Sequence, residues 1–216
     1  MQELPTITPL GDGALIVRFA HSISWDASTR VRAAAAHMRK MAIDSVTDVV
    51  PAYTTIAVYF DSALIAFDAV AEAIAPAINA SAVDRLDRTT LIEIPVRYDG
   101  PDLTDVAERT GLTVAEVIAR HSSRTYRAYM SGFVPGFAYL GDLDPSLVLP
   151  RRAVPRVRVP AGSVAIAAAQ TAVYPLETPG GWHLIGSTTS EMFDADRNPP
   201  ALIHAGDTVR FVPVVA

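Results

Sequence analysis

Residues 159–190 read VPAGSVAIAAAQTAVYPLETPGGWHLIGSTTS, short apolar runs separated by turn residues, with Glu177 as their single formal charge. The chain from Ser131 onward is also rich in turn residues, because it holds 10 of the 16 prolines and 8 of the 12 glycines. Short runs between such residues are typical of strands in an all-β barrel or sandwich. The closing segment Thr208–Val214 also alternates like a strand. We therefore expect the C-terminal part of the chain to be mostly β.

The N-terminal part instead alternates strands with helices. Apolar residues recur at helical spacing in two segments and follow strand-like patterns in the others. The expected elements are a strand Ala14–Phe19, a helix capped by Asp26, strands Val46–Val50 and Thr54–Phe60, a helix Phe67–Ile78 and a strand Leu91–Val96. The order βαββαβ is the split pattern of ferredoxin-like α+β domains, which host many unrelated functions.

The change of composition predicts two domains. We place an α+β domain at residues 1–90 and a mostly β domain at residues 91–216, which includes a short helical connector at about 101–122. The connector holds two expected helices, Asp102–Arg109 and Thr113–His121, joined at Gly111. It also resembles a fragment of a helix-turn-helix motif, but the acidic chain favours a plain helical hairpin.

Charge and composition exclude several classes of protein. The 216 residues carry a net charge of −5 without a basic arm, so we expect no nucleic-acid partner. No apolar run suits a membrane span and no secretory signal is visible, which favours a cytoplasmic protein. Cysteine is absent and Lys40 is the only lysine. Thiolate chemistry and the standard phosphate-binding P-loop are therefore excluded.

The quoted stretch holds side chains that could perform chemistry. A mostly apolar, turn-rich wall with a few polar groups is what a small-molecule pocket needs. The alternative is a sandwich core whose hydroxyl groups hydrogen-bond to turn backbones. Glu177 could be a general base in a desolvated pocket or a solvated loop acid. His183 could move protons near neutral pH or be a hydrogen-bonded structural residue, and the histidines show no metal-ligand spacing. We expect no tightly bound transition metal.

Two further segments could contact a ligand. Residues 132–141, GFVPGFAYLG, combine glycine, proline and aromatic residues, as in a backbone cradle for an oxyanion or phosphate or in an aromatic-lined structural turn. The densest basic cluster is formed by Arg151, Arg152, Arg156 and Arg158. Arg156 and Arg158 would project from one face of a strand toward a phosphate or an acidic partner, or protect an exposed sheet edge.

These segments belong to a longer ordered string. After GFVPGFAYLG at 132–141 come LDP at 143–145, PRR at 150–152, PR at 155–156, RVPAGSV at 158–164, QT at 170–171, YPL at 174–176, PGGWHLIG at 179–186 and GDTVRF at 206–211. The string resembles the signature of the KipI family, whose members are also called allophanate hydrolase subunit 1 or the B subunit of 5-oxoprolinase (PxpB). Where that family has a glycine-rich turn, this chain reads AIAAAQT at 165–171, and Ser187 stands where a basic residue is common.

The resemblance implies a cyclophilin-like β-barrel and a role as one subunit of an ATP-dependent 5-oxoprolinase, which opens the lactam of 5-oxoproline to glutamate. It implies as partners a KipA or allophanate hydrolase subunit 2-type protein and a LamB/YcsF-type subunit, with ATP, and Mg²⁺, shared among the subunits. The alternatives are a KipI-type inhibitor of a histidine kinase and an allophanate hydrolase subunit 1.

Roles for individual residues follow from side-chain chemistry. Because the chain lacks a P-loop, we expect the active site to be completed by a partner chain. Candidate catalytic residues are Glu177, His183 and Tyr174. Candidate substrate-binding residues are Gln170, Thr171, Gly136, Gly180 and Gly181, and candidate phosphate-binding residues are Arg156 and Arg158. No residue is assigned to a metal.

Overall fold

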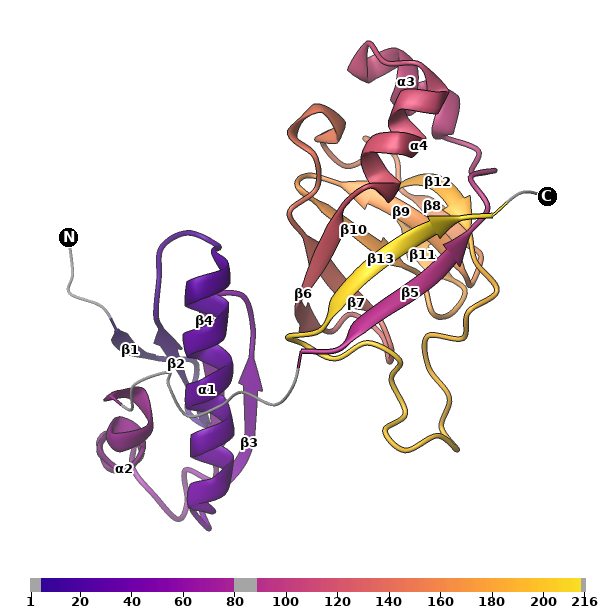
Figure 1. Cartoon of the computed structure of the whole chain (residues 1–216). Coiled ribbons are helices and arrows are strands. Elements are labelled where there is room, and N and C mark those ends of the chain that lie inside the picture. The colour runs from indigo at the N-terminus through magenta and orange to yellow at the C-terminus, as the bar shows by residue number, and fades with distance from the viewer. Residues whose placement is uncertain (1–4, 80–88, 215–216) are drawn as a thin grey trace. The chain divides into compact units, whose positions relative to one another are not determined.

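The computed structural model describes residues 5–79 and 89–214, and the chain divides into two compact units between Arg88 and Thr89. The first unit has one antiparallel sheet, in the order β1-β2-β4-β3, and two helices (Figure 1). Its elements are β1 (Thr6–Pro9), β2 (Ala14–Arg18), α1 (Trp25–Met41), β3 (Val46–Pro51), β4 (Thr55–Phe60) and α2 (Phe67–Asn79).

The core of the first unit lies between the sheet and its helices. Alternate residues of β2 and β4 are buried, among them Val17 and Ile56, and they pack against the apolar stripes of α1 and α2. Helix α1 begins slightly earlier than expected, because Ser24, not Asp26, is its N-cap and accepts a 3.1 Å hydrogen bond from the Ala27 amide. Asp26 lies in the first turn, where a carboxylate favours the helix N-terminus.

The second unit is built on a seven-stranded sheet in the order β12-β9-β10-β7-β6-β13-β5, with a two-stranded ribbon of β8 and β11 beside it. Its elements are β5 (Leu91–Val96), α3 (Leu103–Thr110), α4 (Val114–Ser122), β6 (Thr125–Ser131), β7 (Ala138–Gly141), the short 3₁₀ helix η1 (Pro145–Leu147), β8 (Arg156–Val159), β9 (Ser163–Ala167), β10 (Gln170–Val173), β11 (Thr178–Gly180), β12 (His183–Ser187) and β13 (Thr208–Pro213).

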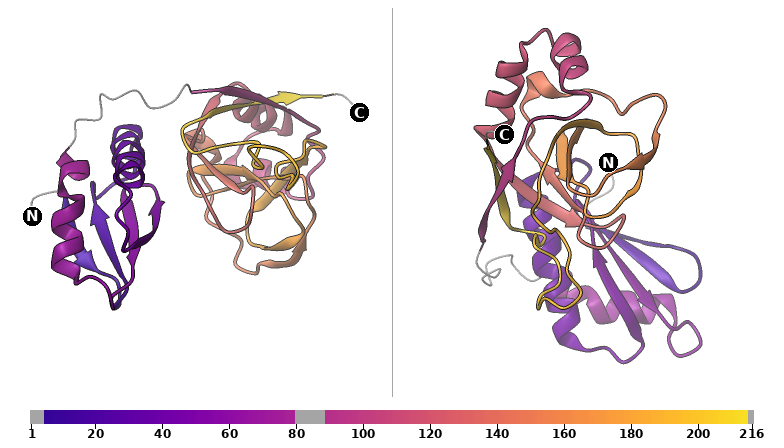
Figure 2. Two further views of the ribbon diagram at one scale, coloured as in Figure 1. Left: turned by 90° about the horizontal axis from the view of Figure 1, so that it is seen from below. Right: turned by 90° about the vertical axis from the view of Figure 1, so that its right-hand side faces the viewer.

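The seven-stranded sheet curls until its two edges nearly meet (Figure 2). Just after β5, Arg97 exchanges two backbone hydrogen bonds of 2.9 and 2.8 Å with Ser187 of β12. This bridge joins the opposite edges of the sheet. The mixed α/β architecture with a nearly closed, barrel-like sheet fits the expected cyclophilin-like barrel.

One expected strand lies in the other unit. Leu91–Val96 forms β5 but pairs in parallel with β13 at the edge of the barrel sheet, so its assignment as the last strand of the N-terminal sheet is wrong. Strand β1, which was not predicted, occupies the edge of the first sheet beside β2. Local periodicity finds a strand but does not specify its partner, which lies at the far end of the chain.

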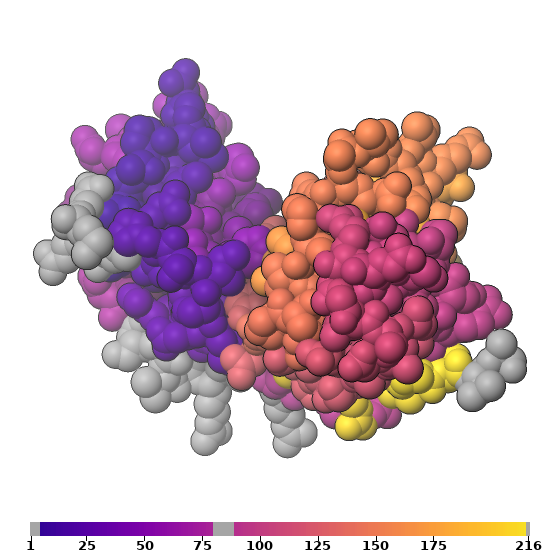
Figure 3. Space-filling model, turned by 90° about the horizontal axis from the view of Figure 1, so that it is seen from above, coloured from indigo at the N-terminus to yellow at the C-terminus, as the bar shows by residue number. Residues whose placement is uncertain are grey.

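The two connector helices pack against the barrel. A capping box at Thr113 and Glu116 begins α4, and Gly111 ends α3 in the left-handed conformation, with φ 69°. Figure 3 shows α3 and α4 (magenta) beside the segment drawn in orange, which includes β8, β9 and β10. Helix α3 packs on β12 and α4 on β13. The site described next is held by α3 and the loops around β12.

Candidate functional site

A cavity of about 240 Å³ opens on the second unit. Five aromatic side chains line it, from residues Phe133, Phe137, Tyr139, Tyr174 and Trp182. The remaining lining residues are Arg151, Pro155, Pro179, Gly180 and Gly181. Among these described residues only Arg151 is charged, and none is a serine, cysteine, histidine, lysine or acid. The cavity can therefore bind and orient a small molecule, but its own walls supply no general base or reactive nucleophile.

Phe137 is the centre of the aromatic wall. Its ring meets the rings of Phe133, Tyr139, Tyr174 and Trp182 edge to face, with ring centroids 4.9 to 5.8 Å apart. Such edge-to-face pairs add stabilisation beyond their buried area. The wall is thus preformed before any ligand arrives.

The strands behind the cavity explain why it is aromatic. Alternate residues of β9 face opposite sides of the sheet. Val164 and Ile166 belong to the main core, whereas Ala165 and Ala167 belong to the aromatic cluster. Small residues on the cavity side leave room for large rings.

Gly180 allows Tyr174 to reach the cavity. A Cβ on Gly180 would lie 2.3 Å from the Tyr174 hydroxyl, so no other residue fits there without movement. Burial raises the pKa of Tyr174, against the opposing effect of a backbone hydrogen bond from Trp182. The phenol is therefore protonated near neutral pH and can act as a donor, not as a base.

Three of the four clustered arginines are paired with acids. Arg152 Nη1 and Arg156 Nη2 lie 2.8 and 2.7 Å from the same oxygen of Asp102. Arg158 lies 3.5 Å from Glu177, and both side chains are exposed, Glu177 by 56%. Arg151 forms no ion pair with any described carboxylate.

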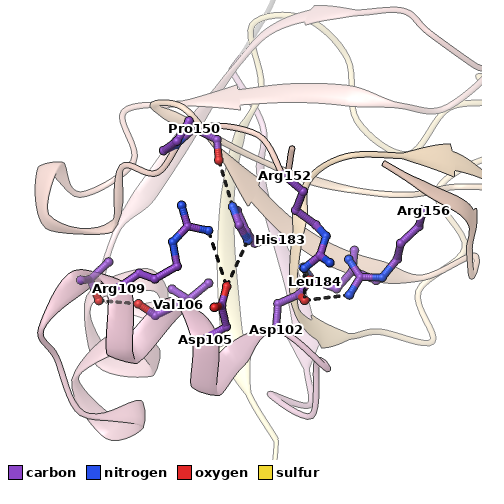
Figure 4. A network of polar contacts seen from close by, with 10 residues as sticks. Asp102, Asp105, Val106, Arg109, Pro150, Arg152, Arg156, His183 and Leu184 are labelled. Atoms are coloured by element: carbon purple, nitrogen blue, oxygen red, sulfur yellow. Dashed lines mark hydrogen bonds and ion pairs between the residues drawn. The ribbon is translucent and has the colours of Figure 1, made fainter. Parts of the chain in front are cut away.

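Asp102, at the start of α3, is the buried centre of this network (Figure 4). Its side chain is only 5% exposed, and its second oxygen accepts a 2.7 Å hydrogen bond from the Leu184 amide. Burial opposes ionisation, but hydrogen bonds from Arg156 and Leu184, with the charges of both arginines, hold the pKa of Asp102 below its usual value. Asp102 therefore stays ionised. It binds Nη2 of Arg156, so this nitrogen is not available to a phosphate.

His183 points away from the cavity. It is fully buried, and its Nε2 lies 2.9 Å from the Pro150 carbonyl, to which it donates. Its Nδ1 has no hydrogen-bond partner among the described residues and lies 3.8 Å from Asp105 of α3 (Figure 4). Trp182 and Leu184, on either side of it, belong to the aromatic cluster. The imidazole thus supports the loop before Arg151 and does not line the cavity.

Thr171 belongs to a separate series of hydrogen bonds, in which it is joined to His121 and Tyr98. The Thr171 hydroxyl donates to the Ala165 carbonyl at 3.0 Å and contacts His121 Nε2 at 2.9 Å. The other ring nitrogen of His121 lies 2.7 Å from the Tyr98 hydroxyl. Burial lowers the pKa of His121 to about 3, so the ring is neutral. The structure places Thr171 in the main core rather than in the cavity.

The structure thus brings together only part of the expected site. Tyr174, Gly180 and Gly181 line the cavity. Gln170 is half-buried on β10 and does not line the cavity. Gly136 also lies outside the lining and packs against Met192 and Phe193. A Cβ added to Gly136 would lie 2.6 Å from the Phe193 Cβ. Glu177 is exposed, not desolvated.

Apart from Tyr174, the sequence did not single out the side chains that line the cavity. Arg151 was one of four similar arginines, and the aromatic residues of 132–141 were equally compatible with a structural turn. No group of three or more potential metal ligands occurs among residues 5–79 and 89–214. No helix in those ranges is long and apolar enough to cross a membrane.

Comparison with known proteins gives a consistent result. The family model for the carboxyltransferase domain, subdomain C and D, matches residues 5–203. The B subunit of 5-oxoprolinase from Bacillus subtilis (strain 168) is 38% identical over 96% of this chain and 92% of its own length. The protein of the same name from Escherichia coli O157:H7 is 55% identical over 56% of this chain and 57% of its own.

A solved structure supports the same relationship. The crystal structure of TTHA0988 matches with a TM-score of 0.83 and 37% identity over 94% of this chain, which spans 40% of that longer chain. The match of the family model over most of the chain, with the near full-length relative from Bacillus subtilis, establishes the relationship. The chain belongs to the family of 5-oxoprolinase B subunits (PxpB).

Proposed function

We propose that this chain is one subunit of an ATP-dependent 5-oxoprolinase, which converts 5-oxoproline to glutamate. The observation that carries the proposal is the likeness to the B subunit of 5-oxoprolinase over nearly the full length of both chains. The small aromatic cavity supports it, because about 240 Å³ is below the roughly 300–1,000 Å³ of pockets for drug-sized ligands and suits a small metabolite.

The reaction explains why several subunits and ATP are needed. Ring opening adds one water across the lactam C–N bond, and an unstrained lactam is a poor electrophile. Transfer of a phosphoryl group to the lactam oxygen would create a leaving group, and hydrolysis of ATP consumes a second water. In this scheme the cavity holds the ring and shields it from solvent, and Tyr174 offers a protonated hydroxyl.

We assign the nucleotide to the partner subunits. The cavity is small and carries one cation, and the neighbouring arginines are paired with Asp102 or Glu177. These residues do not fit a triphosphate. The partners we propose are a KipA or subunit 2-type protein and a LamB/YcsF-type subunit, which would supply the base and the nucleotide site that the cavity walls lack.

Exposed aliphatic residues near the cavity support contact with such a partner. Val157 of β8 is 81% exposed and Val154 of the preceding loop is 75% exposed. Both lie within two residues of Pro155, which lines the cavity. Clustered exposed apolar side chains suit a protein interface. A partner docked there would cover the cavity mouth.

The test of the function is reconstitution of the complex. This chain, purified with both partner subunits, should form glutamate from 5-oxoproline only when ATP and all subunits are present. A stable complex that hydrolyses allophanate instead would favour the allophanate hydrolase reading. Failure to form a complex, with inhibition of a histidine kinase, would favour the KipI-type inhibitor.

The docking surface has its own test. Val157→Asp should weaken assembly with the subunit 2-type partner by about 10-fold or more, because it places a charge in an apolar contact. Leu64→Asp, at a 73% exposed residue of the first unit, is the matched control and should assemble normally. Equal assembly of the two variants, measured by analytical ultracentrifugation, would place the interface elsewhere.

A further inference from the structure

Contacts on both sides fix the backbone around Arg151, an exposed residue that lines the cavity. Arg152 donates its amide to the Gly181 carbonyl at 2.8 Å and its guanidinium to Asp102. On the other side, the Pro150 carbonyl accepts from His183. Both neighbours of Arg151 are therefore tied to groups on or beside β12 and α3. The Arg151 side chain lines the cavity without an ion pair among the described carboxylates.

The contrast with its neighbours is informative. Arg152, Arg156 and Arg158 each have a carboxylate within 3.5 Å, with Asp102 shared by Arg152 and Arg156, so each of these arginines is paired within the chain. Arg151 is the one member of the cluster that both reaches the cavity and lacks an acidic partner in the described structure. A guanidinium beside an apolar wall is suited to bind a planar carboxylate through two parallel hydrogen bonds.

We propose that Arg151 binds the carboxylate of the ligand, while the aromatic wall holds its ring. This inference rests on the proposed function for the identity of the ligand, a small cyclic amide that carries a carboxylate. In this arrangement the ligand ring packs against the aromatic lining of the cavity. Arg151 thus selects carboxylated lactams over neutral ones.

Phe133 forms the exposed edge of the aromatic wall. Its backbone has φ 74°, a left-handed conformation that is strained for a bulky residue, and its side chain is 60% exposed. The loop is fixed nearby by the hydrogen bond of 3.1 Å from Gly132 N to Phe137 O. Its ring already contacts Phe137 edge to face, with 5.5 Å between the ring centroids, so this part of the wall is in place before a ligand binds.

Binding can be measured on this chain through Trp182, which lies in the cavity. Trp25, the other tryptophan, lies on α1 of the first unit, so a Trp25→Phe background isolates the signal. The probes are 5-oxoproline and pyrrolidin-2-one, which has the same lactam ring without the carboxylate. We expect 5-oxoproline to bind at least about 10-fold more tightly than pyrrolidin-2-one.

Two arginine variants make the test specific. Arg151→Gln should weaken 5-oxoproline binding by about 10-fold or more and leave pyrrolidin-2-one binding unchanged. Arg210→Gln, which removes an exposed arginine of β13 outside the cavity lining, should change neither. Equal loss for both probes in Arg151→Gln would indicate a structural role, and no saturable binding of 5-oxoproline would also overturn the inference.

The reconstituted complex separates this inference from the proposed function. If the complex is active and Arg151→Gln leaves the KM for 5-oxoproline unchanged, the function stands and the carboxylate site is wrong. If no glutamate forms but the chain binds 5-oxoproline in an Arg151-dependent way, the proposed reaction fails and the carboxylate site stands. For an active complex we expect a rise in KM with a smaller change in kcat.

Discussion

Thr171 on β10 and Tyr174 just after it lie three residues apart, yet they belong to regions of opposite character. Thr171 joins His121 and Tyr98 in a buried chain in which each polar side chain has a partner. Tyr174 faces a cavity whose one charge, on Arg151, has no carboxylate partner in the described structure. Polar side chains that are paired with one another stabilise the fold. The Arg151 guanidinium, which has no carboxylate partner in the described structure, is available to a ligand.

The largest expected effect comes from removing His121, the middle residue of the buried hydrogen-bonded series. His121→Ala should lower the free energy of unfolding of the second unit by about 3 kcal/mol or more, because it leaves a void, removes the partner of the Tyr98 hydroxyl and removes one of the two partners of the Thr171 hydroxyl. Urea unfolding followed by Trp182 fluorescence in the Trp25→Phe background measures it. His37→Ala, on the exposed side of α1, is the control. A loss below about 1 kcal/mol would mean that the chain relaxes around the gap.

Asp102→Asn should affect both regions at once. The amide retains an acceptor for Leu184 but removes the negative charge that Arg152 and Arg156 share, which should cost roughly 2–3 kcal/mol. Because Arg152 supports Arg151, 5-oxoproline should also bind more weakly. Calorimetric unfolding and the fluorescence titration test the two effects. If the variant is destabilised but binds 5-oxoproline as before, the Asp102 network does not contribute to ligand binding.

The pH dependence of stability sharpens the same contrast. The pKa of His121 is lowered by burial from 6.5 to about 3, so the unfolded chain binds a proton in this window that the folded chain does not. The free energy of unfolding should therefore fall as the pH drops below 6.5, by up to about 1.4 kcal/mol per pH unit. His121→Asn should lose this part of the slope between about pH 6.5 and 5. Identical slopes in the two proteins would contradict a buried neutral histidine.

The smallest expected effect is stabilising and lies in the turn between β9 and β10. Ala168 has φ 48°, a left-handed conformation that costs alanine more than glycine. Ala168→Gly should raise the free energy of unfolding by about 0.5–1 kcal/mol without changing ligand binding. Ala169→Gly, next to it and without a positive φ, should be neutral or destabilising. Thermal unfolding of both variants distinguishes strain from a general effect of glycine.

Local patterns predicted most elements, because they depend on neighbours in sequence. Helical spacing located α1 and α2, and the turn residues indicated a mostly β C-terminal part, although they did not place most of its strands. The site was harder to predict, because which of its charged side chains are paired depends on residues far away in the sequence. Asp102 lies 50 residues from Arg152, so the sequence did not show which arginines it balances. Period-two alternation could have separated Thr171 from Tyr174, whereas nothing local identifies Arg151.

The parallel pairing of β5 with β13 also shapes how the second unit is made. Arg210 and Glu93, paired across these strands, are 117 residues apart, and β13 is the only neighbour of β5 in the described sheet. At about 5–20 residues per second, synthesis of these 117 residues leaves β5 without its partner for roughly 6–23 s. Its apolar residues Ile94 and Val96 need protection during that time. The barrel is therefore completed only after translation reaches its last strand, and a chain truncated before β13 would lose the partner of β5.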